Sequence, residues 1–344
     1  MKIRMSDIAK MANVSIAAVS LALSGKPGIS EETRAKILTI VKETGYLPRA
    51  MVKAEQVYGL APTLRFVACT DSGIVSNHYN QQPFFMELIR HIEEQCRAGG
   101  YSLFFSSVPY DRFEEAIEEL ESGHKSNGIL LLGTNLSRKQ IELVESMQPN
   151  LVVIDTCLET MDANFIVMNN RMGAYQAGSY LLELGHRKIG YVQSNARMYN
   201  FDSRKQGFLQ ALSEAGVLLP GKHLFTVSPT VVTSQEELKN RLLCLKGDWP
   251  TALFCECDYM AISAMKTLYE AGLRVPDDIS VVGFDNIQEA MIVTPELTTV
   301  HVEKLKIAEL AVAKLMAGTE GTELVKSKIW LDTRLVIRNS CRKL

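Results

Sequence analysis

The chain has 344 residues, an apolar content of 47% and a formal net charge of −2 at pH 7. This length and composition support two or three compact units with large buried cores, and they exclude a solvated tail. No segment approaches the roughly 20 apolar residues of a membrane span, no apolar signal segment opens the chain, and its seven cysteines are scattered. We therefore expect a cytoplasmic protein with free thiols and no membrane partner.

The first predicted elements are two short helices joined by a tight turn. We expect Ser6 to cap the first helix, Asn13 to end it and Ser15 to cap the second. The apolar residues expected to pack the two helices together are Ile8, Ala9, Met11, Ala12, Val19, Ala22 and Leu23. In a helix-turn-helix, residues near the start of the second helix contact bases in the major groove. The predicted groove readers are Ile16, Ala17 and Leu21.

A loop over 24–29 leads to a third predicted helix, which begins at Ser30 with two acids behind it and ends at Gly45. Residues 1–60 carry nine lysines and arginines against five acids, whereas the rest of the chain carries 28 against 34. A basic N-terminal part on an acidic body suits a protein that places one end against DNA phosphates.

The order of these motifs resembles the DNA-binding headpiece of the lactose-repressor/galactose-repressor family of bacterial transcription regulators. The matching residues are Val14-Ser15, Val19-Ser20, Ser30-Glu31-Glu32-Thr33-Arg34 and Gly45-Tyr46-x-Pro48. The resemblance implies a helix-turn-helix headpiece over 1–47, a hinge over 48–60, a homodimer and a pseudo-palindromic double-stranded operator. The DNA contacts that it implies are Ser6, Ser15, Ile16, Ala17, Ser20, Leu21, Lys26, Arg49 and Lys53.

The DNA end departs from the family pattern at two places. Leu21 stands where family members often have an arginine that reads guanine, and neither Ile16 nor Ala17 can form a bidentate hydrogen bond. These residues predict an operator read through thymine methyl groups and DNA shape. Glu55 stands where the family has a leucine wedge in its hinge helix, which predicts a weaker or differently bent operator centre.

From residue 64 onward, short apolar strands alternate with helical stretches, which predicts an α/β fold with parallel sheets. The predicted strands are 64–70, 101–107, 128–133, 151–155, 165–170, 188–194, 252–257 and 279–285. The predicted helices are 84–97, 113–122, 172–184, 204–215, 235–245 and 259–271. Gly185, Gly216 and Gly272 each follow a helix, where a left-handed cap is expected.

Polar residues follow many of these strands, at the edge where open parallel sheets bind ligands. They are Thr70-Asp71-Ser72, Asp155, Asn169-Asn170, Gln193-Ser194-Asn195, Asp258 and Asp285-Asn286. Each one alone is equally well explained as a helix cap or a turn residue. Their recurrence at the same end favours a ligand cleft.

The family resemblance extends over this body. The matching segments are Leu184-Gly185-His186-Arg187-Lys188-Ile189, Arg204-x-x-Gly207-Phe208, Asp258-x-Met260-Ala261, residues 275–285 and Pro295-x-Leu297-Thr298-Thr299-Val300. It implies an effector-binding domain over 61–344, made of two Rossmann-like subdomains of the periplasmic-binding-protein type. Its approximate parts are an N-subdomain over 61–168 and 297–325 and a C-subdomain over 169–293 and 326–344. The implied effector contacts are Asp71, Asp155, Arg204, Cys257, Asp258 and Asp285.

Two features leave the effector's identity open. Cys257 replaces the family's usual asparagine. The segment over 72–83 is longer than the family's loop, and this segment is either a polar lid over the ligand or a mobile surface loop. We expect a transcriptional repressor controlled by a sugar or sugar derivative, with a nucleobase or nucleoside as the alternative effector. A solute-binding protein without a DNA role is a third interpretation. We expect no enzyme, cofactor or metal, because no phosphate loop, nucleophile elbow or metal-ligand cluster is present in the sequence.

Overall fold

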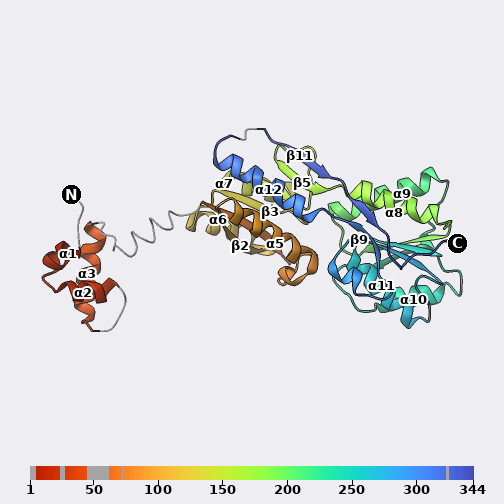
Figure 1. Cartoon of the computed structure of the whole chain (residues 1–344), viewed down its shortest axis with the longest axis horizontal. Helices are drawn as coiled ribbons and strands as arrows, with labels where there is room; N and C mark the ends of the chain where they lie inside the picture. Colours follow the sequence, from red (N-terminus) through yellow and green to blue (C-terminus); the bar gives the residue numbers. More distant parts are fainter. Residues whose placement is uncertain (1–4, 24–27, 45–61, 72, 323–324) are drawn as a thin grey trace. The chain divides into compact units, whose positions relative to one another are not determined.

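The computed structural model describes residues 5–23, 28–44, 62–71, 73–322 and 325–344. Contacts divide the chain into two compact units, an N-terminal unit (Met1–Ala61) and a body (Pro62–Leu344), each described here by itself (Figure 1). The predicted hinge over 48–60, the predicted DNA contacts Lys26, Arg49 and Lys53, and Glu55 lie outside the described residues.

The described part of the N-terminal unit consists of α1 (Met5–Ala12), α2 (Ile16–Leu23) and α3 (Glu31–Thr44). The predicted turn after α1 is confirmed, because Asn13 has a left-handed backbone with φ 57°. Ser15 caps α2, since its Oγ accepts from the backbone N–H of Ala18 at 3.2 Å. Ser30 caps α3 in the same way, through the N–H of Thr33 at 3.2 Å.

A small apolar core holds these three helices together. Its buried members are Ile8, Ala9, Ala12, Val19, Ala22 and Ile37. Arg34 adds a polar tie, because its Nη1 donates to the carbonyls of Leu21 and Ala22, each at 3.3 Å. Two predictions here are wrong. The α1 helix begins at Met5, so Ser6 lies inside it instead of capping it, and Met11 is 56% exposed because it points away from the core.

The body contains two six-stranded sheets. The first has the order β11-β5-β4-β3-β1-β2, with every pair parallel. Its strands are β1 (Thr63–Thr70), β2 (Ser102–Pro109), β3 (Gly128–Leu132), β4 (Leu151–Ile154), β5 (Asn164–Met168) and β11 (Lys328–Leu331). The second has the order β12-β10-β9-β8-β6-β7, in which β12 is antiparallel to β10. Its strands are β6 (Ile189–Ser194), β7 (Leu224–Val227), β8 (Ala252–Cys255), β9 (Ser280–Asp285), β10 (Thr298–His301) and β12 (Arg334–Val336).

Helices cover both faces of each sheet (Figure 1). With the first sheet they form the first half of the body: α5 (Pro83–Ala98), α6 (Phe113–Gly123), α7 (Arg138–Met147) and α12 (Lys304–Thr319). With the second sheet they form the second half: α8 (Asn170–Glu183), α9 (Tyr199–Glu214), α10 (Glu236–Cys244) and α11 (Asp258–Glu270). Single 3-10 turns occur at Tyr79–Gln81, Tyr110–Arg112, Gly221–His223 and Gln288–Met291. The predicted left-handed glycines are confirmed, with φ 94° at Gly185, 68° at Gly216 and 79° at Gly272.

The chain passes between the two halves three times, after β5, after β10 and after β11. Two predicted boundaries differ from this course. Residues 298–301 pair with β9 in the second sheet, although the boundary at 297 assigned them to the first subdomain. Residues 328–331 pair with β5 in the first sheet, although the boundary at 326 assigned them to the second. Both strands are four-residue extended segments beside a crossing, and a local pattern does not show which sheet such a segment joins.

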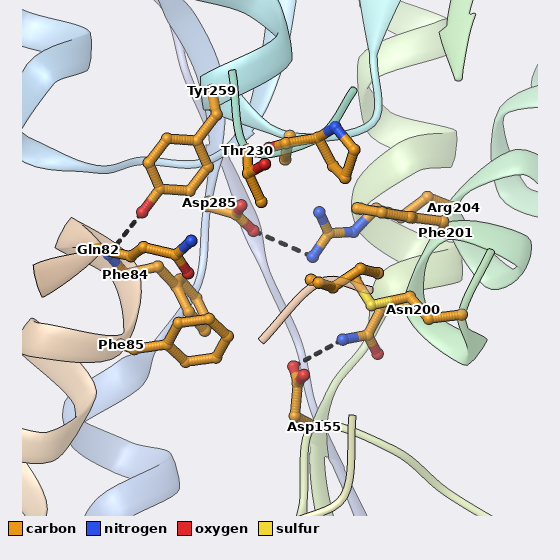
Figure 2. A pocket seen from close by; sticks show the side chains of 14 residues that line it. Gln82, Phe84, Phe85, Asp155, Asn200, Phe201, Arg204, Thr230, Tyr259 and Asp285 are labelled. Atoms are coloured by element: carbon orange, nitrogen blue, oxygen red, sulfur yellow. Dashed lines mark hydrogen bonds and ion pairs between the residues drawn. The ribbon is translucent and has the colours of Figure 1, made fainter. Parts of the chain in front are cut away.

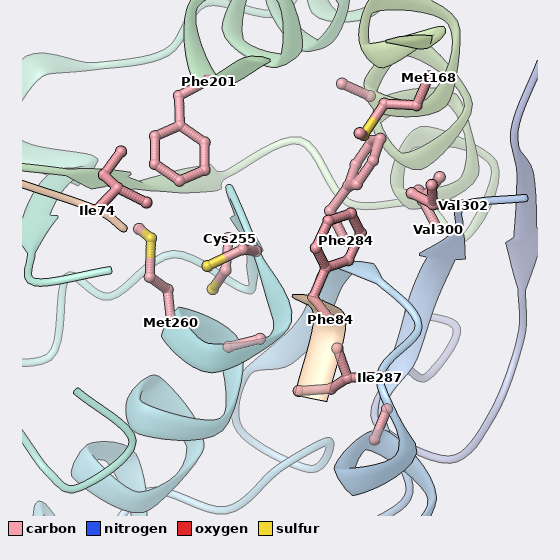
Figure 3. Packing of buried hydrophobic residues seen from close by; sticks show 14 of the residues in the cluster. Ile74, Phe84, Met168, Phe201, Cys255, Met260, Phe284, Ile287, Val300 and Val302 are labelled. Carbon is pink, nitrogen blue, oxygen red and sulfur yellow. The ribbon is translucent and has the colours of Figure 1, made fainter. Parts of the chain in front are cut away.

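The buried core explains why the body strands are almost continuously apolar. Along β1, Phe66 packs into a large cluster that includes residues of α5 and α12, whereas the next residue, Val67, packs into a second cluster with α6 and α7. The large cluster continues through the second half, and Figure 3 shows the part that contains Phe284 and Val300. These two side chains lie so close to α8 that a Cβ at Gly173 would come within 2.8 Å of each.

Candidate effector pocket and DNA-reading helix

A pocket lies between the two halves of the body, at the carboxyl ends of the parallel strands (Figure 2). Its cavity volume is about 50 Å³, and the empty space among its lining residues, counting the part open to solvent, is about 470 Å³. From the first half it is lined by Ile74, Gln82, Phe84, Phe85 and Asp155. From the second half it is lined by Met198, Asn200, Phe201, Arg204, Pro229, Thr230, Cys257, Tyr259 and Asp285.

Backbone strain marks several of the strand ends. Asp71, Asp155 and Asp285 have positive φ angles of 61°, 65° and 115°, and none of them is glycine. Such a conformation costs an L-residue about 1–3 kcal/mol, so surrounding contacts must hold it in place. Asp155 and Asp285 are both buried beside the pocket, and both have hydrogen bonds that fix their carboxylates.

Arg204 of α9 forms the centre of the polar side of the pocket, and it is only 2% exposed. Its Nη2 donates to Asp285 Oδ1 at 3.0 Å, and its Nη1 donates to the carbonyl of Glu256 at 2.5 Å. The guanidinium also lies on the ring of Phe284, 3.7 Å from the centroid. These contacts fix the plane of the guanidinium beside the pocket.

A chain of amide hydrogen bonds, which we call the amide relay, links Arg204 to the opposite half. Arg204 Nε donates to Asn170 Oδ1 at 2.9 Å, and Asn170 Nδ2 donates to Asn200 Oδ1 at 2.8 Å. Asn200 Nδ2 then donates to Asp155 Oδ1 at 2.6 Å (Figure 2). Thr134 donates to the other oxygen of Asp155. Because Asp155 follows a strand of the first sheet, the relay joins the two halves directly.

Aromatic side chains form the wall opposite the relay. Phe84 and Phe85 come from the start of α5, and their rings meet edge to face with centroids 5.4 Å apart. The hydroxyl of Tyr259, in the second half, accepts from the backbone N–H of Phe84 at 3.1 Å. Figure 2 shows this second contact between the halves on the side away from Asp155. Phe201, one residue after Asn200 on α9, is the fourth ring of the pocket.

Lys304, at the start of α12, supports this wall from behind. It is 2% exposed, and its Nζ donates to the carbonyl of Asp285 at 3.1 Å and pairs with Glu87 Oε2 at 3.1 Å. The same ammonium lies 5.6 Å from the ring centroid of Phe84. A single buried cation therefore connects the strained end of β9 to α5 and to the aromatic wall.

Burial controls the protonation of the pocket's acids. It raises the pKa of Asp155 to about 6, and it also raises the pKa of Asp285, against the opposing effect of the Arg204 cation. The thiol of Cys257 is neutral, because burial raises its pKa and the nearby Asp285 adds to that effect. With two carboxyl groups and one guanidinium lining it, the pocket gives no electrostatic advantage to an anionic ligand.

Four of the six predicted effector contacts line the pocket, and two do not. Asp258 is fully buried, with Oδ1 accepting from Thr299 Oγ1 at 2.6 Å and Oδ2 accepting from the N–H of Ile287 at 3.0 Å. It ties β10 to the segment after β9 instead of facing the cavity. Asp71 is exposed and accepts from Asn77 Nδ2 at 2.8 Å. The four that line the pocket are Asp155, Arg204, Cys257 and Asp285.

Neither the aromatic wall nor Asn200 was predicted from the sequence. A signal for Asn200 was present, because it lies one helical turn before Arg204 and so shares its face of α9. The longer segment before α5 is packed, since Val75 and Tyr79 are buried and Ile74 lines the pocket. In its described residues this segment fits neither a wholly polar lid nor a detached surface loop.

The DNA-reading helix α2 presents a mixed surface. Ile16 is 53% exposed at its start, Ser20 is exposed, and Leu21 is half-buried. Ser15 is exposed, although its hydroxyl oxygen already accepts the capping bond from Ala18. The side chains of Ala17 and Ser6 lie outside the described residues.

Two further classes of site are absent from the described part of the chain. It contains no group of three or more His, Cys, Asp or Glu side chains that could hold a metal ion. None of the described helices is long and apolar enough to cross a membrane.

Comparisons with known proteins match both units. Residues 4–49 match the bacterial regulatory proteins of the lacI family, and residues 179–341 match the periplasmic binding protein-like domain. The HTH-type transcriptional repressor PurR of Mannheimia succiniciproducens is 33% identical over 341 residues, which cover 98% of each chain.

Two solved structures share the fold of the whole chain. The Lac repressor dimer bound to operator and the anti-inducer ONPF superposes with a TM-score of 0.72 at 23% identity, covering 99% of this chain and 100% of that one. The transcriptional regulator CelR in complex with cellobiose gives 0.71 at 22% identity, covering 98% of this chain and 99% of that one.

A helix-turn-helix unit joined to a two-sheet body with a pocket between its halves is the architecture of a DNA-binding regulator that responds to a small molecule. The chain belongs to the lacI family of bacterial regulatory proteins, whose relatives here are transcriptional repressors.

Proposed function

We propose that this protein is a homodimeric repressor whose affinity for operator DNA is set by a neutral sugar or sugar derivative in the body pocket. The observation that carries the proposal is the line of buried polar groups from Asp285 through Arg204 and Asn200 to Asp155, facing an aromatic wall. A sugar ring offers hydroxyls at its edge and C–H groups on its faces. The polar line suits the hydroxyls, and the aromatic rings suit the faces.

The carboxylates of the pocket have unoccupied hydrogen-bond acceptor positions, which favour a ligand with several hydroxyl donors. A carboxylate has about four acceptor positions, and the hydrogen bonds described above occupy two on Asp155 and one on Asp285. A ligand hydroxyl can donate to a remaining position and accept from Arg204 or Thr230, both in the lining. Such a site rejects a ligand without hydroxyls, because its buried acceptors would lose water without gaining a partner.

Closure of the two halves is the proposed link to DNA. The amide relay and the Tyr259 to Phe84 bond both cross the pocket, so a ligand that adds contacts on both sides favours the closed arrangement. The effector changes DNA affinity only by the amount that it prefers one closure state over the other.

A nucleobase or nucleoside is the second candidate effector. The four rings of Phe84, Phe85, Phe201 and Tyr259 favour a flat aromatic ligand, because stacking on such rings adds to area burial.

The dimer is proposed to form through exposed apolar side chains at the edge of the first sheet, on α5, on both faces of its edge strand β2 and just after β2. They are Met86, Phe104, Phe105 and Tyr110, each between 44% and 51% exposed. Apolar side chains gathered at a sheet edge favour association with a second copy. We place the protein in the cytoplasm, where it would meet its operator.

Thermal unfolding of the full chain with a panel of neutral sugars, sugar phosphates and nucleobases tests the effector proposal. A saturating neutral sugar should raise the Tm by about 5 °C, and Asp285→Asn should remove that shift. The matched control is Asp162→Asn at an exposed acid outside the pocket, which should keep it. A shift caused only by sugar phosphates would contradict the proposal, and a shift caused only by nucleobases would select the second candidate.

DNA binding is tested by selecting duplexes from a random pool and measuring their affinity with and without the stabilising sugar. We expect selected sites with two inverted half-sites and an affinity that changes when the sugar is added. Affinity for DNA that no stabilising ligand alters would contradict control through the pocket.

A further inference from the structure

A second hollow lies on the body beside two of the three crossings between its halves. Asn169 and Asn170 line it from the crossing after β5, and Trp330 lines it from β11, just before the last crossing. It has about 930 Å³ of empty space and shares none of its lining residues with the effector pocket. Because both halves contribute to it, an occupant would contact both of them.

An aromatic corner forms one side of this hollow. Trp330 is 40% exposed, and its Nε1 donates to the hydroxyl of Tyr199 at 3.2 Å. Trp330 belongs to the first sheet and Tyr199 begins α9 of the second half, so this bond also joins the halves. An indole that keeps this much exposed surface among polar neighbours offers an apolar platform for a ligand.

Two opposite charges face the hollow without an ionic partner among the described residues. Glu159, between β4 and β5, is exposed and forms no hydrogen bond or ion pair with the described residues. Arg171 of α8 donates only to the neutral side chain of Gln210, at 2.8 and 3.2 Å. By contrast, Asp202 in the same lining is already paired with Arg197 at 2.7 Å.

We propose that this hollow is a second, regulatory binding site for a small zwitterion, a free amino acid. Its ammonium group pairs with Glu159, its carboxylate pairs with Arg171, and its side chain packs on Trp330. Glu159 lies in the first half and Arg171 in the second, so the ligand's two charges span the junction between the halves. A ligand with one charge satisfies only one of the two groups.

Asn170 gives this site a direct connection to the effector pocket. Asn170 is among the lining residues of the hollow although it is only 2% exposed, and its side chain is the middle of the amide relay, with Arg204 Nε at 2.9 Å and Asn200 at 2.8 Å. An occupant that shifts Asn170 changes the positions of two pocket residues. The amino acid therefore acts on the same closure equilibrium as the pocket ligand, through the middle of the relay.

Tryptophan fluorescence tests the proposal, because the chain has two tryptophans and only Trp330 lies in the hollow. The variant Trp249→Phe leaves Trp330 as the sole emitter in the full chain. Titration with each proteinogenic L-amino acid should give a saturable change in emission for at least one of them. Glu159→Gln and Arg171→Gln should each weaken that binding about tenfold or more. Glu118→Gln, an exposed acid on α6, should leave it unchanged.

The matching amine without a carboxylate, and the matching acid without an amino group, complete the titration. Both should bind at least about tenfold more weakly than the amino acid. The proposal is overturned if no amino acid gives a saturable change at millimolar concentration, if both charge variants keep the affinity, or if either analogue binds as well. The titration needs no pocket ligand, so its result is independent of the sugar panel.

Discussion

The proposed effector pocket and the predicted DNA-reading helix, α2, present different chemistry to their partners. In the pocket, Arg204, Asn200 and Asp155 are nearly inaccessible to solvent. Asn200 and Asp155 bond to each other across the two halves, and Arg204 pairs with Asp285 of its own half. On α2, Ile16 is 53% exposed, and its side chain has no polar atom to read a base edge. We therefore expect the pocket to select by hydrogen bonds and the helix to select by shape and methyl contacts. Substitutions at the two sites should differ in size accordingly.

Loss of Arg204 should give the largest effect. Arg204→Met removes the cation that pairs with buried Asp285, and leaving a buried charge unpaired costs about 3–5 kcal/mol of unfolding free energy. Denaturant unfolding measures this loss. Arg241→Met, at an exposed arginine of α10, is the control and should cost about 0.5 kcal/mol or less. If Arg204→Met lowered the free energy of unfolding no more than the control does, the ion pair between Arg204 and Asp285 would not contribute to stability.

The pH dependence of stability should show the burial of Asp155. Its folded pKa of about 6 exceeds its ordinary value of 3.8, so the folded state holds a proton over this interval that the unfolded state has released. The contribution of Asp155 to stability is fully present below about pH 4 and is lost as the pH rises through about 6. The loss is on the order of 3 kcal/mol.

Comparison with Asp155→Asn isolates that contribution, because other buried acids titrate in both proteins. The free energy of unfolding of the wild type, relative to the variant, should fall between about pH 4 and about pH 7. A difference that is flat with pH, or one that grows as the pH rises, would show that Asp155 is not buried as described.

Breaking the amide relay should lower the free energy of unfolding by less than the changes at Arg204 and Asp155. Asn200→Ala leaves Asp155 Oδ1 without its donor and leaves Asn170 Nδ2 with only the Met168 carbonyl, at 3.3 Å, as acceptor. This should cost about 2 kcal/mol of stability and weaken effector binding. The control is Asn195→Ala, at an exposed residue after β6. Equal stability of the two variants would argue against a relay that holds the halves together.

The smallest effect is expected at the DNA-reading helix. Ile16→Ala, or replacement of thymine by uracil in the half-sites, should each cost about 1 kcal/mol, which is about fivefold in affinity. Band-shift titration measures both, and uracil placed outside the operator is the control. Unchanged affinity with uracil in every half-site position would exclude reading by methyl contacts.

Local sequence patterns predict much of the scaffold. The helix-turn-helix was identified by Asn13 and the capping serines Ser15 and Ser30, because turns and caps depend on neighbouring residues alone. The alternation of strands and helices likewise predicted both sheets and the edge at which the pocket lies.

The direction of individual side chains was not predictable in the same way. Asp258 and Asp285 both stand at strand ends, yet Asp258 turns to Thr299 and away from the cavity, since a strand far along the chain supplies its donor. The aromatic wall depends on where α5 meets the second half, which no local pattern shows. For the same reason β10 and β11 were assigned to the wrong subdomains.

The late position of those two strands has a consequence for synthesis on the ribosome. β10 lies inside the second sheet, between β9 and β12, and β11 completes the edge of the first, yet both come after residue 297. Neither sheet can close until β10 and β11 have left the exit tunnel. A nascent chain therefore cannot complete the two sheets that flank the pocket until the segment over 298–331 has emerged.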